Sequence, residues 1–286
     1  MKIAVLLPVR RAQSTLRATL DSLLQQISLL DAEILVAVSE LDPTYGMVRN
    51  LVPHPQIRTL IVPGRRSIPQ LRGDALALAN ADYVVITEDH CTFPPGWLNR
   101  LVEASQGAVV SGGGVLNGRE SWVGWAQYFT RYWAFQPPLP EGPAQHLPGN
   151  NACYPRTVLD RYGHLLLQGF WEADFNAALR KTESLCVVAG CDVIQHQQRG
   201  ILEYIPLRFR HGRCYGARRE DKRLARVPVV PAVLFLRAAR TVFAKKQRRI
   251  HFLFASPLLL VYFCAWAAGE AWGYIFGAGD SCSGSD

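Results

Sequence analysis

The sequence predicts an α/β protein in which helices cover a mostly parallel β-sheet, with a membrane helix near the C-terminus. Three observations lead to this prediction. Short runs rich in β-branched residues alternate with segments of helical periodicity in the first part of the chain. An apolar segment without a charge follows at 252–269. The 286 residues are 49% apolar and 19% charged, which supports a large core and excludes a disordered or fibrous chain.

The expected elements alternate along the chain. Residues 3–7 are strand-like, and apolar residues then recur at helical spacing from Leu16 to Leu30. The remaining expected elements are strands at 33–38, 57–62, 83–87 and 108–111, and helices that begin near Pro69 and Pro95. Strands that are separated by helices favour a parallel sheet with both faces covered.

The net charge of +8 is concentrated in one region. Residues 207–249 hold 14 Lys or Arg against Glu220 and Asp221, whereas residues 1–206 hold 17 basic and 18 acidic residues. Because the basic region lies directly before the apolar segment, it indicates a membrane surface as partner, and no nucleic acid is expected.

The apolar segment is expected to form a transmembrane helix over 250–276, since about 18 apolar residues are long enough to cross a bilayer. The basic residues at 245–249 are expected to stay cytoplasmic, so the domain before them faces the cytosol at the cell membrane. The expected organisation is a folded domain at 1–225, a basic amphipathic segment on the membrane surface at 226–249, the membrane helix, and a tail at 277–286. Glu270 is expected at the bilayer interface or at a functional polar site.

The seven cysteines form neither an even disulfide framework nor a paired zinc motif. They favour a reducing compartment without disulfides.

Polar residues follow the expected strands at the edge where ligands of such sheets gather. They are Pro8 to Arg10, Ser39 with Glu40, and the run Glu88-Asp89-His90. The sequence contains no dinucleotide-binding or P-loop glycine pattern, and the glycines at 112–114 favour a turn or a close backbone contact. Two carboxylates and an imidazole at one strand end repel or compete unless a cation or hydrogen-bond donors compensate them, and hard divalent metals accept such ligands. A solvated acidic turn is the alternative.

At these residues the chain resembles the family-2 glycosyltransferases, which are inverting enzymes of the GT-A type. The resemblance covers roughly residues 1–219. The segment LLPVR resembles the family's first strand, and SIPQLRGDALALANADYVVITEDH resembles its Arg-bearing helix and DXD element. Ser39-Glu40 stands in place of the usual Asp-rich turn, and Glu88-Asp89-His90 in place of the usual aspartates.

The resemblance implies a nucleotide-sugar donor and a divalent metal, Mn or Mg. The implied donor-binding residues are Pro8, Arg10, Ser39, Glu40, Arg72, Glu88, Asp89, Arg210 and Arg213. The implied metal ligands are Asp89, His90 and His196. Arg210 and Arg213 belong to a basic segment that is equally suited to anionic lipid headgroups.

A later segment, GFWEADFNAALRK, resembles the family's acidic motif. It makes Asp174 the candidate catalytic base, with Glu172 as the second choice, because an inverting transfer needs a carboxylate to accept the acceptor's proton. The alternative is that both are helix N-terminal charges favoured by the helix dipole. Asn150, Asn151 and Trp171 are the expected acceptor-binding residues.

The resemblance therefore implies a membrane-bound inverting glycosyltransferase that acts on a lipid-linked or cell-envelope glycan acceptor. Two other classes stay open. A noncatalytic membrane-associated sugar- or lipid-binding protein would keep its ligand without the acidic residues. A nucleotidyltransferase should carry a Gly- and Lys-rich loop after its first strand, and LPVRRAQST has no glycine there.

Overall fold

The computed structural model describes residues 1–28, 30–107, 109–219, 221 and 224–282. The chain divides into two compact units, which are described separately. The first consists of Met1–Leu116 and Phe135–His196, and the second of Asn117–Ala134 and Gln197–Asp286.

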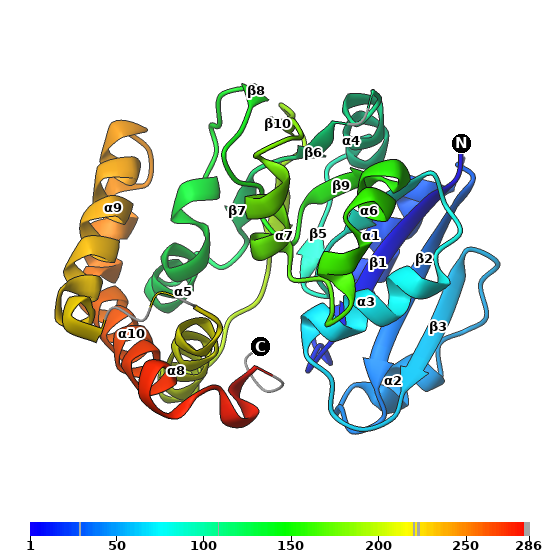
Figure 1. Ribbon diagram of the computed structural model, residues 1–286. Helices are drawn as coiled ribbons and strands as arrows, with labels where there is room; N and C mark the ends of the chain where they lie inside the picture. The colour runs from blue at the N-terminus through cyan, green and yellow to red at the C-terminus, as the bar shows by residue number, and fades with distance from the viewer. Residues whose placement is uncertain (29, 108, 220, 222–223, 283–286) are drawn as a thin grey trace. The chain divides into compact units, whose positions relative to one another are not determined.

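The first unit is built on an eight-stranded sheet (Figure 1). Its strands are β1 (Ile3–Val9), β2 (Ala32–Ser39), β3 (Ile57–Val62), β4 (Tyr83–Ile86), β6 (Val110–Gly112), β8 (Gly142–Pro143), β9 (Ala152–Pro155) and β10 (Leu185–Val187). They follow the order β3-β2-β1-β4-β9-β6-β10-β8. Neighbours are parallel from β3 to β4 and between β6 and β10, whereas β9 is antiparallel to β4 and β6, and β8 is antiparallel to β10. The prediction of a mostly parallel sheet is confirmed.

Helices cover this sheet and bury its central strands. The helices are α1 (Leu16–Ile27), α2 (Tyr45–Arg49), α3 (Ile68–Leu78), α4 (Trp97–Ala104), α6 (Arg156–Arg161) and α7 (Glu172–Leu179), with a 3-10 turn at Gly163–Leu166. Every residue of β1 is buried, as expected for a strand covered on both faces. One core cluster joins alternate residues of β1 and β2 to α3, α6 and α7. The predicted strand at 108–111 is found at Val110–Gly112, and residue 108 lies outside the described residues.

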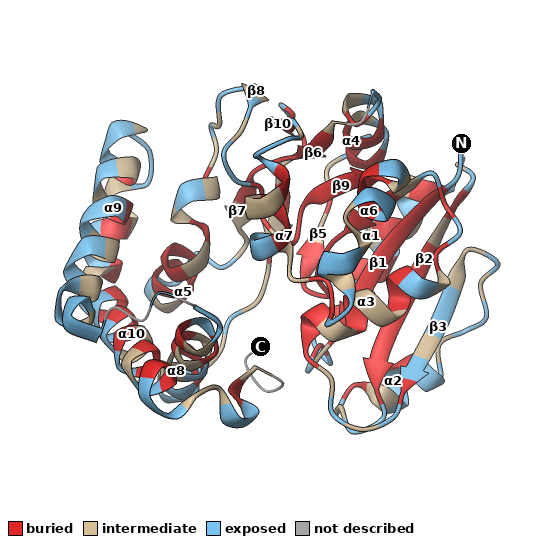
Figure 2. Cartoon of the chain, in the orientation of Figure 1, coloured by how far each residue is buried: buried red, intermediate tan, exposed pale blue. Residues whose placement is uncertain are grey.

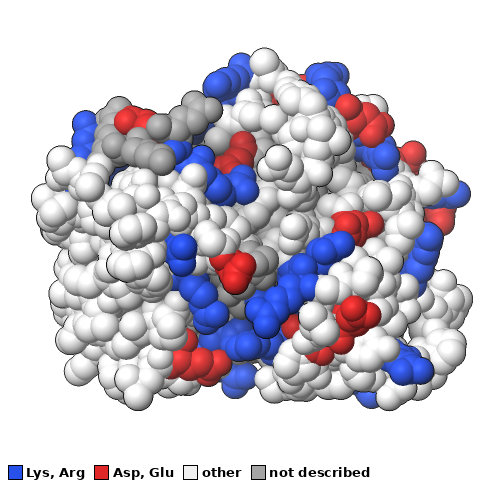
Figure 3. Space-filling view, turned by 60° about the horizontal axis from the view of Figure 1, so that its bottom comes forward, with Lys and Arg blue, Asp and Glu red and all other residues white. Residues whose placement is uncertain are grey.

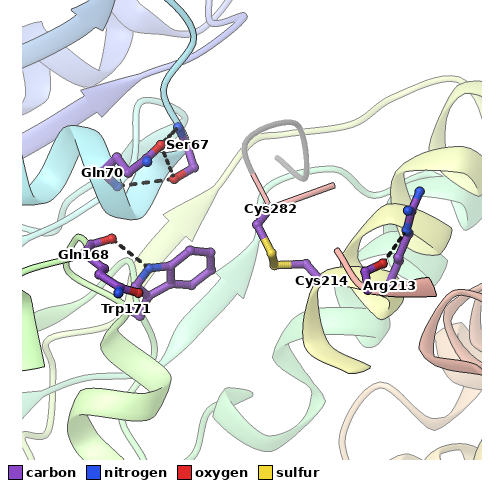
Figure 4. Close-up of a disulfide and its surroundings, with 8 residues drawn as sticks. Ser67, Gln70, Gln168, Trp171, Arg213, Cys214 and Cys282 are labelled. Atoms are coloured by element: carbon purple, nitrogen blue, oxygen red, sulfur yellow. Dashed lines mark hydrogen bonds between the residues drawn. A yellow bond between two sulfur atoms is a disulfide. The ribbon is translucent and has the colours of Figure 1, made fainter. Parts of the chain in front are cut away.

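The start of α3 is fixed by a capping box. Ser67 accepts a hydrogen bond from the Gln70 backbone, and the Gln70 side chain accepts one from the Ser67 backbone (Figure 4). Pro69 occupies the first turn, where its missing N–H costs nothing. This helix carries Arg72 toward the strand ends.

A small second sheet lies beside the end of β4. Its strands are β5 (Cys91–Thr92), β11 (Val193–Gln195) and β7 (Val115–Asn117), in the order β5-β11-β7. Because β11 runs antiparallel to β5, it brings the chain after residue 192 back to the residues that follow β4.

The second unit is helical. It contains α5 (Trp122–Tyr132), α8 (Ile201–Arg218), α9 (Val230–Ala244) and α10 (Arg249–Phe276), with 3-10 turns at Trp133–Phe135 beside it and at Leu224–Val229 and Gly279–Ser281 within it. In this unit α10 packs against α5, α8 and α9. Figure 2 shows that α9 and part of α10 present many exposed residues. Residues 117–134 and 197–219 join this unit, although the sequence placed them in the domain at 1–225.

Two stretches are long and apolar enough to cross a membrane, namely Leu224–Ala244 and Arg249–Phe276. The second coincides with the helix predicted at 250–276. The segment predicted at 226–249 holds most of the 3-10 turn Leu224–Val229, followed by α9. The predicted tail at 277–286 is described only as far as Cys282.

The structure pairs Cys214 in α8 with Cys282 after α10, which corrects the expectation that all cysteines are reduced (Figure 4). The two residues are 68 positions apart, and the sequence gives no sign of the pairing. It arises because α8 packs along α10, so that the segment after α10 ends beside α8.

Candidate active site

The carboxyl ends of the parallel strands meet at one edge of the sheet in the first unit. There the backbone N–H of Arg10, at the end of β1, donates a hydrogen bond of 2.6 Å to Oδ2 of Asp89, after β4. Pro8 is buried within β1 itself. The structure thus brings together two residues that the sequence placed separately at strand ends.

Arg72 links the acidic residues of this edge. Its Nη2 lies 3.2 Å from Oε1 of Glu88 and 2.7 Å from the Gly149 carbonyl, and its Nη1 lies 2.6 Å from Oε2 of Glu172. The Arg72 side chain is 1% exposed. A buried guanidinium needs carboxylates or carbonyls around it, and here they come from three distant segments. The strand end at Glu88 and the first turn of α7 therefore belong to one site.

His90 lies between the two carboxylates that precede it. Its Nδ1 is 2.9 Å from Oδ1 of Asp89, and its Nε2 is 3.1 Å from Oε2 of Glu88. Burial lowers the pKa of His90, but the hydrogen bonds and negative charges of Asp89 and Glu88 outweigh it, so that the net shift is upward.

His196 reaches the same strand end through the small sheet. Its backbone N–H donates a hydrogen bond of 2.8 Å to the carbonyl of His90, and its Nε2 lies 2.9 Å from Oγ1 of Thr92. The antiparallel pairing of β11 with β5 thus places one predicted metal ligand beside another.

The residues at this strand end have the chemistry of a divalent-metal site, because they offer carboxylates and imidazoles. The buried Nε2 of His90 has no hydrogen bond in good geometry. Within the described ranges, however, no three such side chains already converge on one point. Both Oδ atoms of Asp89 bind the protein, so a metal would compete with these contacts.

Ser39 and Glu40, the predicted donor-binding residues after β2, both bind the loop that leads to α3. The Ser39 hydroxyl donates a hydrogen bond of 2.5 Å to the Gly64 carbonyl, and Oε1 of Glu40 accepts one of 2.9 Å from the Gly64 N–H. Asp42 was not among the predicted site residues. Its carboxylate accepts the Arg11 N–H at 3.1 Å and so holds the loop after β1. Its only sequence signal was its position shortly after a strand end.

The side chain of Asn151 is hydrogen-bonded within the protein. It is fully buried, its Oδ1 accepts from Nε1 of Trp97 at 2.9 Å, and its Nδ2 donates to the carbonyls of Gly114 and Cys191. A Cβ on Gly113 would lie 2.1 Å from the Cys191 carbonyl, which confirms the expected close contact in this glycine run.

Asn150, the other predicted acceptor residue of the pair, sits directly beside the strand end. Its carbonyl accepts a 3.1 Å hydrogen bond from the Thr87 hydroxyl, so the segment before β9 is attached to the residue before Glu88. Asn150 is thus held at the strand end through its backbone, whereas Asn151 uses its side-chain amide to join separate loops.

The first turn of α7 carries Glu172 and Asp174. Glu172 packs against the backbone of Gly149, where a Cβ would lie 2.2 Å from its Oε1. Asp174 is exposed. Trp171 precedes the helix, and its Nε1 donates to the Gln168 carbonyl at 3.3 Å (Figure 4). The two acidic residues therefore differ in exposure, and Glu172 is ion-paired with Arg72.

Arg210 and Arg213, the remaining predicted donor-binding residues, lie on α8 in the second unit. Arg210 is exposed. Arg213 donates through Nε to the Gly277 carbonyl at 2.8 Å, so it holds the end of α10 (Figure 4).

Comparisons with known proteins agree with this arrangement. Residues 4–163, more than half of the chain, match the family described as Glycosyl transferase family 2. No curated protein sequence matches the chain.

Three solved structures share the fold. The mannosyltransferase PcManGT from Pyrobaculum calidifontis, in complex with GDP-Man and Mn2+, has a TM-score of 0.61 at 17% identity, over 94% of this chain and 87% of that chain. GalNAc-T7 with UDP, GalNAc and Mn2+ has a TM-score of 0.53 at 14% identity, over 69% and 43% of the two chains. S. aureus TarS 1-349 in complex with UDP-GlcNAc has a TM-score of 0.52 at 12% identity, over 99% and 92%. Since the family match covers more than half of the chain, the chain belongs to glycosyl transferase family 2, and it has the GT-A-like fold that the sequence predicted.

Proposed function

We propose that the protein is an inverting glycosyltransferase that moves a sugar from a nucleotide-sugar donor to a hydroxyl of a lipid-linked or cell-envelope glycan, at the cytoplasmic face of the membrane. One observation carries the proposal. Arg72 joins Glu88, at the strand end where donors of this fold class bind, to Glu172 in the acidic helix. The transfer needs the donor site at the strand end to lie next to the carboxylate that takes the acceptor's proton, and α7 carries that carboxylate.

The donor's nucleotide and diphosphate would lie along the strand ends formed by Pro8, Arg10, Ser39, Glu40, Glu88 and Asp89. Asp89, His90 and His196 would hold a divalent cation, Mn or Mg, whose chemistry is to neutralise the diphosphate as it leaves. Two of the structural neighbours are complexes with Mn2+ and a nucleotide or nucleotide sugar, which supports this assignment.

Asp174 would act as the base. In an inverting transfer the acceptor oxygen bonds to the anomeric carbon as the bond from that carbon to the diphosphate breaks, and a carboxylate takes the hydroxyl proton. Protonation of Glu172 would weaken its ion pair with Arg72, so Glu172 is better suited to hold Arg72 in place. Asp174 is exposed on the same helical turn. Asn150 and Trp171 would contact the acceptor.

The test is nucleotide release from a panel of sugar donors, with and without Mn²⁺ or Mg²⁺. We expect release of nucleoside diphosphate that depends on the acceptor, and its loss in Asp174→Asn. Asp21→Asn, which alters an exposed carboxylate on α1, is the matched control. An Asp174→Asn protein that works as fast as the wild type would contradict the base assignment. Donor binding without any turnover would identify a binding protein, and pyrophosphate release would identify a nucleotidyltransferase.

A further inference from the structure

An uninterrupted apolar stripe runs along the exposed face of α10. The exposed residues recur every three or four positions from one end of the helix to the other, and all of them are uncharged and apolar. They are Ile250, Leu253, Phe254, Pro257, Leu260, Val261, Cys264, Ala268, Trp272, Ile275 and Phe276. Spacing of this kind keeps the residues on one side of a helix. Figure 3 shows a broad uncharged surface on the side of the second unit that carries α9 and α10.

The opposite face of α10 is covered by protein at both ends. Near its start, Phe252 packs on Phe129 of α5, with ring centroids 5.2 Å apart. From its middle onward α10 packs on α8. This contact begins at Tyr262 and Tyr204, whose ring centroids are 4.7 Å apart. These contacts belong to the second unit alone.

The contact between α8 and α10 is a close backbone approach. A Cβ on Gly212 would lie 2.0 Å from the Trp266 carbonyl, and a Cβ on Gly269 would lie 1.9 Å from the Phe209 carbonyl. Each helix repeats the glycine four residues later, at Gly216 and Gly273. Because residue numbers rise together along the two helices, they run parallel, and only glycine permits this separation.

The end of α10 is also fixed to α8. Cys282 is bonded to Cys214, and Arg213 donates to the Gly277 carbonyl. A single crossing by α10 would put Cys282 on the opposite side of the bilayer from Cys214, which the bond excludes. The part of α10 ahead of α8, residues 249–261, is about 20 Å long at about 1.5 Å per residue, whereas the hydrocarbon layer is roughly 30 Å thick.

Deeper insertion would carry α8 into the hydrocarbon. This helix holds Arg208, Arg210, Arg213 and Arg218 beside or beyond the start of its contact with α10. Charged side chains are costly at membrane depth. The connection between α9 and α10 is basic as well, with Lys246 and Arg248 exposed, and it adjoins the first residue of the stripe.

We propose that α10 lies in the plane of the membrane, with its apolar stripe in one leaflet and the basic connection at 245–249 on anionic lipid headgroups, and that it does not cross. This inference is independent of the proposed reaction. Helices with one apolar face and flanking Lys and Arg bind bilayer surfaces in this way. The lipid surface covers the stripe, and the protein covers the rest of the helix.

Vesicle binding by the full chain tests the docking surface. We expect the wild type to sediment with vesicles of phosphatidylcholine and phosphatidylglycerol, more weakly with phosphatidylcholine alone, and more weakly at high salt. Leu253→Gln with Phe254→Gln should weaken binding at least tenfold. Val52→Gln with Leu167→Gln is the matched control, because these residues are 83% and 85% exposed but belong to the first unit. Equal loss in both pairs would overturn the proposal, as would a dimer in solution that the stripe variant dissociates while vesicle binding is unchanged.

Sidedness in sealed membrane vesicles tests whether α10 crosses. Tags at the two chain ends should be cleaved by protease from the same side, and Gln247→Cys should react with an impermeant maleimide from that side too. Tags on opposite sides would demonstrate one crossing. Tags on one side with residue 247 labelled only from the other would demonstrate that both α9 and α10 cross. Either outcome rejects the proposal.

Discussion

The guanidinium of Arg72 lies 2.6 Å from the carboxylate of Glu172, although the two residues are 100 positions apart in the sequence. Because Arg72 also binds Glu88, this contact sets where α7 stands against the strand end.

Arg72→Met should lower the free energy of unfolding by about 3 kcal/mol, because it leaves Glu88 and Glu172 without their cation. Adding Glu172→Gln should restore part of this loss, since one of the two uncompensated charges is then removed. Chemical denaturation of the single and double variants measures the coupling. Strictly additive effects would show that the contact contributes no interaction energy.

Asp174→Asn and Glu172→Gln should differ in kind. The first should lower kcat by about 10²- to 10⁴-fold with an unchanged Tm, since Asp174 is exposed and is the proposed base. The second should lower Tm as well, because it weakens the contact with Arg72. Thermal melts and steady-state nucleotide release on the same preparations separate the two roles. A kcat loss confined to Glu172→Gln would reverse the assignment.

Asn151→Ala should destabilise the first unit by about 3 kcal/mol, because it removes the acceptor of the buried Trp97 indole N–H and a donor to each of the Cys191 and Gly114 carbonyls. The Gly114 carbonyl keeps its hydrogen bond from the Val193 N–H. The exposed Asn99→Ala on α4 is the control and should change stability little. Urea titration followed by tryptophan fluorescence measures both. Similar midpoints for the two variants would mean that the three hydrogen bonds are not needed.

Cys153 should be inert toward thiol reagents in the folded protein. Burial raises its pKa to about 12, and the hydrogen bonds from Ser105 and Ser111 offset this only in part. At pH 8 only about one part in 10⁴ of this thiol is then ionised. Cys264 is exposed and should react first. Mass spectrometry after timed alkylation identifies the order, and rapid labelling of Cys153 without unfolding would contradict it.

The sheet was predictable where its strands are long and fully covered. The strands at 3–7, 33–38 and 83–87 appeared as largely apolar runs because their residues are mostly buried. The strand at 57–62 lies at the edge of the sheet and is only partly buried, and its β-branched residues indicated it. The small sheet was not predicted as a unit, since strands of two or three residues carry no periodicity. The helices of the second unit were visible only as apolar or basic stretches, and nothing local indicated which of them pack together.

The site was predictable only in its parts. Glu88 and Asp89 could be chosen because acidic residues after a strand are conspicuous, and Glu172 because its segment resembles the family's acidic motif. Their connection through Arg72 was not visible, since the contact depends on how α3 and α7 pack on the sheet. The hydrogen bonds that occupy the Asn151 amide likewise come from segments far apart in the chain.

The glycine contact between α8 and α10 has a practical consequence for anyone preparing this protein in soluble form. Deleting the C-terminal helix, the usual way to remove a membrane segment, would strip α8 of the surface against which Gly212 and Gly216 fit. A shortened chain would then lose the apolar stripe of α10 but expose the face of α8 that α10 had covered, which could promote aggregation in its turn. Polar substitutions along the outer side of α10 would improve solubility and leave the helical unit whole.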